Sequence, residues 1–274
     1  YIIIRDGKKG TPIPFWKVYK LTVSGFALNY ATPVGLMGGE PYRIMELTPY
    51  VGASKATSSV ILYVMMHIFS HFCFWFFSIF LYLALRPVDI AMGTILAVVG
   101  AVSLLAIYFF MKGYKNGMAV RTLKLLQHIP FIKEWAKRFS ENKREALERV
   151  DSQIAELHKQ RRSTFYASLS LEFMARIIGC LEVYFILNIL TTDVSFPACI
   201  LIMAFTSLFA NLFFFSPMQL GAREGGFALA VGGLAIPGAF GVYTGLITRV
   251  RELIWIVIGV LLMKVGNGTP TNKA

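Results

Sequence analysis

Two segments of the chain place charged residues beside proline and glycine, close to long apolar runs. In each, a glutamate follows a proline by seven residues, and an arginine lies within three residues of that glutamate. The residues concerned are Pro33, Glu40 and Arg43 in the first segment and Pro217, Arg223 and Glu224 in the second. A carboxylate and a guanidinium form charge-assisted hydrogen bonds, so such a pair can hold a charged or phosphate-bearing group.

Each segment also has an asparagine at the end of its apolar helix and glycines near its glutamate. Proline and glycine interrupt a helix, and the freed backbone groups must be buried in protein or line a cavity. Glutamate and arginine inside a membrane mark a substrate or ion path by default. The alternative is that both segments are ordinary extramembrane loops. The candidate substrate-binding residues here are Asn29, Thr32, Pro33, Gly35, Gly39, Glu40, Arg43, Asn211, Pro217, Gly221, Arg223 and Glu224.

Four further candidates lie inside or beside predicted spans: His71, Glu172, Arg176 and Arg249. Glu172 and Arg176 are four residues apart on one helix, so they can pair with one another. That pair fixes helix packing or contacts substrate. For His71 we expect a hydrogen bond to the broken-helix region. Arg249, Arg251 and Glu252 enter the last predicted helix early, where they snorkel to an interface or face the cavity.

The sequence predicts no metal site, no cofactor and no catalytic residue. The three cysteines have no paired spacing, and His67 with His71 lacks an adjoining third ligand. No nucleophile elbow, phosphate loop or dinucleotide fingerprint is present.

The elements that must position these residues are membrane-spanning helices. The chain of 274 residues is 56% hydrophobic and 15% charged, whereas soluble domains carry roughly 25% charge. Spans are predicted at 58–85, 88–111, 164–190, 195–215 and 243–264, and residues 1–4 end a helix that begins earlier. We therefore expect a single, N-terminally truncated domain over 1–274: an all-α polytopic protein with about six spans and two broken or re-entrant segments.

The connection over 112–163 is strongly basic, with thirteen Lys or Arg residues against six acidic ones. Basic loops stay in the cytoplasm, so this connection is predicted to be cytoplasmic and the protein to lie in the inner membrane. Within it, an apolar stripe over 140–162 packs on the protein's own face, or else joins two copies or binds a partner. The charge reflects topology and anionic lipid rather than nucleic acid.

The two broken segments enter from opposite sides by this charge rule, as the halves of an inverted-repeat transporter do. We therefore expect them to meet, with Glu40 and Glu224 within ~15 Å of each other near the membrane midplane, on the scale of one transporter site.

The motifs Thr32-Pro33-x-Gly35-x-x-Gly38-Gly39-Glu40 and Ser216-Pro217-x-x-x-Gly221-x-Arg223-Glu224-Gly225 resemble the two signatures of the lysylphosphatidylglycerol synthase transmembrane family, also called flippase-like proteins. The resemblance implies an inner-membrane domain that moves lipids, with Glu40, Arg43, Arg223 and Glu224 in its functional region. The aminoacyl-transferring domain of some relatives is absent from these residues. Many relatives carry an arginine where this chain has His67 and His71, which bears on head-group selectivity.

Three functions are compatible with these features. The first is the flipping of a phospholipid, anionic or aminoacylated, or of a lipid-linked head group. The second is a membrane-bound transferase that acts on a lipid carrier, with Glu40 or Glu224 as general base. The third is a non-catalytic scaffold that binds a partner through 140–162.

Overall fold

The computed structural model describes residues 1–5, 13–31, 38–116, 145, 162–191, 194–213 and 219–264. These residues form α-helices and no β-strand, which confirms the all-α class. The helices are α1 (Ile2–Arg5), α2 (Phe15–Ala31), α3 (Gly39–Val51), α4 (Ala53–Leu85), α5 (Ile90–Asn116), α9 (Arg162–Leu190), α10 (Phe196–Leu212), α11 (Ala222–Gly232) and α12 (Gly238–Lys264).

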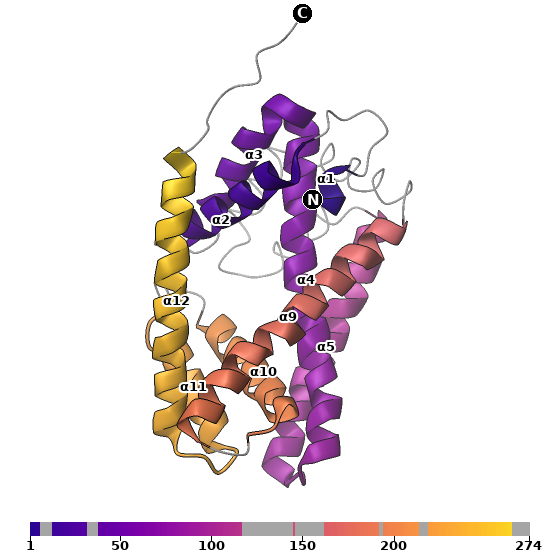
Figure 1. Cartoon of the computed structure of the whole chain (residues 1–274). Helices are drawn as coiled ribbons and strands as arrows, with labels where there is room; N and C mark the ends of the chain where they lie inside the picture. The colour runs from indigo at the N-terminus through magenta and orange to yellow at the C-terminus, as the bar shows by residue number, and fades with distance from the viewer. Residues whose placement is uncertain are drawn as a thin grey trace, which may run out of the picture.

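Three of the described helices, α4, α5 and α9, are long and apolar enough to cross a membrane. Helix α12 has 27 residues and a length of about 40 Å, which also suffices for a crossing, although it carries charges. Figure 1 shows α4, α5 and α12 running along the long dimension of the molecule, with α9 crossing it obliquely. The chain is a multi-pass membrane protein, as expected.

Helices α2 and α3 form an antiparallel pair, here called the first hairpin. Leu21 near the start of α2, Leu47 near the end of α3 and Val60 near the start of α4 share one buried cluster. Lys17 of α2 forms an ion pair of 2.8 Å with Glu46 of α3. Burial lowers the pKa of the Lys17 ammonium, but the hydrogen bond and charge of Glu46 outweigh it, so this pKa lies above its usual value. The open end of the first hairpin is therefore fixed by a charged lysine.

Helices α10 and α11 form the second hairpin. Cys199 and Ile202 near the start of α10 share a buried cluster with Phe227 and Val231 of α11, so both legs end at the same place. The span predicted over 195–215 is thus the first leg of a hairpin, which ends at Leu212 and returns as α11.

The two hairpins occupy opposite ends of the molecule. In Figure 1, α2 and α3 lie at the end where α12 finishes, and α10 and α11 lie at the end where α12 begins. Each hairpin is followed directly by a long helix, α4 in the first case and α12 in the second. The predicted inverted repeat requires such an arrangement.

Close packing brings α2 against α12. The hydroxyl of Ser24 donates to the carbonyl oxygen of Gly259 at 3.1 Å. A Cβ at Gly259 would lie 2.7 Å from both the Ala27 Cβ and the Val23 carbonyl oxygen, which is too close for any side chain. Glycine at this position lets the two backbones approach, as small residues do between membrane helices.

Candidate functional site where the hairpin tips meet

The tip of the first hairpin is tied together by Asn29 and Glu40. The Asn29 side-chain oxygen accepts from the backbone N–H of Gly39 at 2.7 Å, and its nitrogen donates to Glu40 Oε1 at 3.2 Å. Glu40 Oε1 also accepts from Arg43 Nη1 at 2.9 Å. The asparagine at the end of α2 thus satisfies the first turn of α3, where backbone N–H groups have no helical partner.

Arg43 is buried and satisfied on every side of its guanidinium. Its Nη2 donates to the carbonyl oxygen of Thr22 at 3.1 Å, and its Nε to that of Leu21 at 3.4 Å. The guanidinium also lies over the ring of Tyr63 of α4, 5.1 Å from its centroid. A Cβ at Gly25 would overlap this guanidinium, so the arginine occupies the space that glycine leaves on α2.

The tip of the second hairpin has the same charges with different partners. Glu224 Oε2 accepts from the backbone N–H of Gly221 at 2.9 Å, which caps the start of α11. Gly221 has a φ of 78°, a left-handed conformation that glycine adopts without strain. Glu224 Oε1 accepts from Arg249 Nε at 2.7 Å, and this ion pair joins α11 to α12.

The two tips are in direct contact. Arg223 of α11 forms an ion pair with Glu252 of α12 and donates to the hydroxyl of Tyr30, at the end of α2, at 3.4 Å. The Tyr30 hydroxyl in turn donates to Glu252 Oε2 at 2.6 Å. The expectation that segments 29–43 and 211–226 meet in space is therefore confirmed through Tyr30 and Arg223, while the separation of Glu40 and Glu224 and their depth in the membrane stay predictions.

The meeting point lies at half the length of a spanning helix. Residue 251 is the midpoint of α12, about 20 Å from each end, and Arg249 and Glu252 flank it. These residues were expected early in a helix that begins at 243, and that boundary was wrong. The buried, paired charges that the second tip shares with α12 thus lie about halfway along a helix of 27 residues.

A second polar cluster joins α4 to α9, also at half their lengths. His67 Nδ1 lies 3.2 Å from Glu172 Oε2. Arg176, the midpoint of α9, donates to Ser70 Oγ at 2.7 Å and to the His67 carbonyl oxygen at 2.9 Å. Among the described side chains, Glu172 and Arg176 form no ion pair with one another, so the predicted direct pair is wrong. Both bind α4 instead.

His71 lies away from both tips. Its ring packs between the rings of His67 and Trp75, with centroids 5.3 and 5.5 Å away. Its buried Nδ1 has no hydrogen-bond partner among the described residues. The expected hydrogen bond from His71 to the broken-helix region is therefore not formed within the described part of the chain.

Several predicted residues lie outside the described residues or outside the charged network. Thr32, Pro33, Gly35 and Pro217 lie outside the described residues, as does nearly all of the 112–163 connection, including the stripe over 140–162 apart from positions 145 and 162. Asn211 is described, and its side chain donates to the Ser207 carbonyl oxygen of its own helix at 2.7 Å. It therefore does not join the legs of its hairpin in the way that Asn29 does.

The candidate site predicted from the sequence did not include the two residues that connect the tips, Tyr30 and Glu252. Glu252 had a usable signal, since a carboxylate in a long apolar helix marks a functional position. Tyr30 had a weaker one, its place beside Asn29 at a helix end. The described residues contain no group of three or more His, Cys, Asp or Glu placed to hold a metal ion.

The chain was compared with known proteins. A family model described as the lysylphosphatidylglycerol synthase TM region matches residues 3–259 of the 274. No curated protein and no solved structure matches the chain.

Proposed function

We propose, from the premise that this chain belongs to the lysylphosphatidylglycerol synthase transmembrane-region family, that it flips a phospholipid or lipid-linked head group across the cytoplasmic membrane. The family makes it a membrane protein related to lipid handling. That the chain flips lipid, which head group it carries and in which membrane it acts are the parts that we propose.

One observation carries this proposal: two hairpins from opposite ends meet at the midpoint of α12 through Tyr30, Arg223 and Glu252. A head group that crosses a bilayer needs polar partners at the depth where lipid offers none. A site reached by hairpins from both sides supplies such partners and is typical of inverted-repeat transporters.

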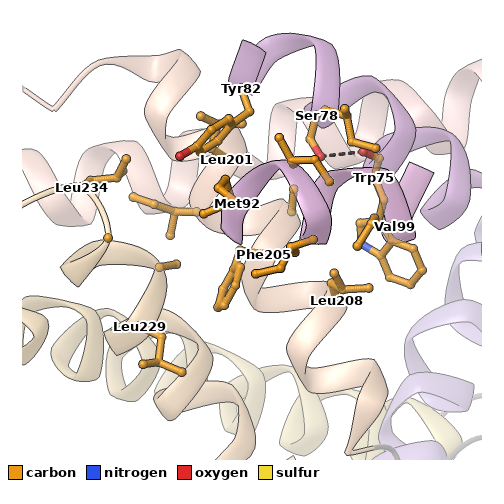
Figure 2. Close-up of a pocket in the computed structure, with 17 residues that line it drawn as sticks. Trp75, Ser78, Tyr82, Met92, Val99, Leu201, Phe205, Leu208, Leu229 and Leu234 are labelled. Atoms are coloured by element: carbon orange, nitrogen blue, oxygen red, sulfur yellow. Dashed lines mark hydrogen bonds between the residues drawn. The ribbon is translucent and has the colours of Figure 1, made fainter. Parts of the chain in front are cut away.

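A separate apolar cavity of about 170 Å³ is suited to the lipid tails. Figure 2 shows side chains of α4, α5, α10 and α11 around it, among them Met92, Phe205 and Leu229. Its few polar groups include Ser78, whose hydroxyl is bonded to the Trp75 carbonyl oxygen. An acyl chain fits this lining, because it has no hydrogen bonds to satisfy.

The orientation follows from charge. The 112–163 connection, on which the thirteen basic residues gather, belongs on the cytoplasmic side, and the first hairpin then enters from the cytoplasm. A cysteine at position 145 should resist an impermeant maleimide in intact cells and react after lysis. Reaction in intact cells would reverse the orientation.

Reconstitution tests the function. In vesicles with a trace of acyl-chain-labelled phosphatidylglycerol, the purified chain should make inner-leaflet label accessible to dithionite faster than empty vesicles do. Tyr30→Phe removes only the hydroxyl between Arg223 and Glu252 and should slow this exchange at least tenfold. Tyr243→Phe, on an exposed face of α12, is the matched control and should exchange at the wild-type rate.

Two outcomes would count against the proposal. One is a wild-type chain that moves neither phosphatidylglycerol nor phosphatidylethanolamine. The other is equal exchange by the Tyr30→Phe and Tyr243→Phe variants, since the tips would then play no part in transport.

A further inference from the structure

One ion pair at half the depth of the molecule is far more exposed than the pairs of the tips. Arg251 of α12 binds Glu182 of α9 at 3.0 Å, with 48% and 27% of their side chains exposed. The side chains of the three ion pairs at the tips are between 6% and 16% exposed. The Arg251–Glu182 pair therefore lies at an accessible boundary between α9 and α12, whereas the three ion pairs at the tips are largely buried.

An exposed arginine at this depth needs water or a polar ligand beside it, because hydrocarbon does not solvate a guanidinium. Arg251 is the midpoint of α12, so it cannot reach a membrane surface about 20 Å away. The boundary between α9 and α12 thus carries an accessible pair of opposite charges.

Arg251 also connects this accessible pair to the buried network. Its Nη2 lies 3.7 Å from Glu252 Oε1, an oxygen that pairs with Arg223. If Glu182 is displaced, Arg251 keeps its contact with Glu252 and offers the rest of its guanidinium to a new anion. A phosphate is a suitable replacement, since guanidinium binds phosphate oxygens in the same forked geometry as a carboxylate.

From this geometry we infer that Arg251 and Glu182 form the entry site for the head group. Arg251 binds the lipid phosphate, and the released Glu182 binds a primary ammonium on the same head group. The ligand class is a phospholipid whose head group carries both a phosphate and a free amine. This inference rests on the proposed function and names its substrate class and side entrance.

The second accessible pair, His67 with Glu172, lies at the other edge of α9 and differs in kind. Its side chains are 44% and 24% exposed, but histidine carries a charge only when protonated. An arginine suits a residue that must hold a phosphate whenever lipid arrives, because its guanidinium does not depend on a histidine-like protonation for its charge.

The test compares two lipids in vesicles of phosphatidylcholine and phosphatidylglycerol at nine to one, with a trace of acyl-chain-labelled phosphatidylethanolamine or phosphatidylglycerol. Arg251→Gln should slow exchange of both lipids at least tenfold. Glu182→Gln should slow the exchange of phosphatidylethanolamine about tenfold and leave the exchange rate of phosphatidylglycerol within twofold of the wild type. Arg86→Gln, which removes an arginine from the exposed turn after α4, is the control and should match the wild type.

Lipid retained by the detergent-purified protein gives a readout that does not depend on transport. Native mass spectrometry after exposure to an equal mixture of the two lipids should show phosphatidylethanolamine favoured by the wild type and the preference lost in Glu182→Gln. That result supports the entry site even if the wild type fails to flip lipid, in which case only the proposed function is wrong.

Three outcomes would overturn the inference. The first is an unchanged lipid preference in Glu182→Gln, and the second is wild-type exchange by Arg251→Gln. The third is an equal loss of both lipids in Glu182→Gln, which would mean that the pair only holds α9 to α12.

Discussion

The two hairpins begin from the same plan and are connected in different ways. In each, a helix of 17 residues leads to the tip, and a short helix with a glutamate in its first turn returns from it. In the first hairpin, Glu40 pairs with Arg43 of its own helix and with Asn29 of the opposite leg. In the second, Glu224 and Arg223 bind α12, through Arg249 and Glu252.

The charged residues of each tip bind different groups because the long helix that follows each hairpin presents different side chains to it. Helix α12 presents Arg249 and Glu252 to the second tip, whereas α4 presents the ring of Tyr63 to Arg43 of the first. The first hairpin therefore satisfies the charges of Glu40 and Arg43 largely within itself. The second hairpin pairs its charges with α12.

The largest effect should come from the bond that fixes the second hairpin. Glu252→Gln leaves the buried Arg223 without its counter-charge, and breaking a buried pair costs about 3–5 kcal/mol. The melting temperature in detergent should fall more for Glu252→Gln than for the double change Glu252→Gln with Arg223→Gln. A double variant as unstable as the single one would show that the pair is not buried as described.

Next in size is the contrast between the two glutamates. Glu224→Gln weakens a charged bond between α11 and α12, worth about 1.5–3 kcal/mol. Glu40→Gln should cost less, because Arg43 keeps two carbonyl oxygens and the Tyr63 ring. The melting temperatures of the two variants are measured side by side. A lower melting temperature for Glu40→Gln than for Glu224→Gln would contradict the difference described between the two hairpins.

The two asparagines give a smaller and equally direct contrast. Asn29→Ala leaves the Gly39 N–H without its acceptor and should cost about 1–3 kcal/mol, the penalty for an unsatisfied buried group. Asn211→Ala removes a bond within its own helix from an exposed side chain and should stay within about 0.5 kcal/mol. Thermal melts of the pair should separate clearly, and equal losses would mean that the tips are held alike.

Only a small loss of stability is expected at the second polar cluster. Glu172 binds a half-exposed His67, so Glu172→Gln should cost at most about 1 kcal/mol. Since Arg176 bonds to α4 rather than to Glu172, the double change with Arg176→Gln should be at least as unstable as either single one. A higher melting temperature in the double variant than in the single variants would instead support a direct ion pair between Glu172 and Arg176.

The equal proline-to-glutamate spacing was enough to predict that the two segments correspond and meet. Each segment carries a glutamate and an arginine that need polar surroundings, and the charge of the loops predicted that the two segments enter from opposite sides. The connection itself was not predictable, because Tyr30 and Glu252 are 222 residues apart and either could bind many partners. The direct pair of Glu172 with Arg176 was predicted from their spacing on one helix. That spacing permits a pair but does not exclude better partners on α4, which both residues bind.

The start of α12 was missed for a different physical reason. Gly238 and Gly241 lay before the last predicted helix, which began at 243, yet they lie within α12 together with Gly245. A Cβ at Gly241 would overlap the backbone of Phe227, so these glycines let α11 approach α12. In a membrane helix, small residues four apart mark a packing face as readily as a loop.

The depth of the two tips is the most direct test of a shared site between opposed hairpins. Spin labels at positions 38 and 220, in vesicles, should both show power-saturation depths near the bilayer midplane and both collide with a water-soluble nickel reagent. Labels at 16 and 89 should report the two opposite surfaces. Depths that place 38 and 220 at opposite surfaces, each in open solvent, would contradict the shared site and the lipid transport proposed from it.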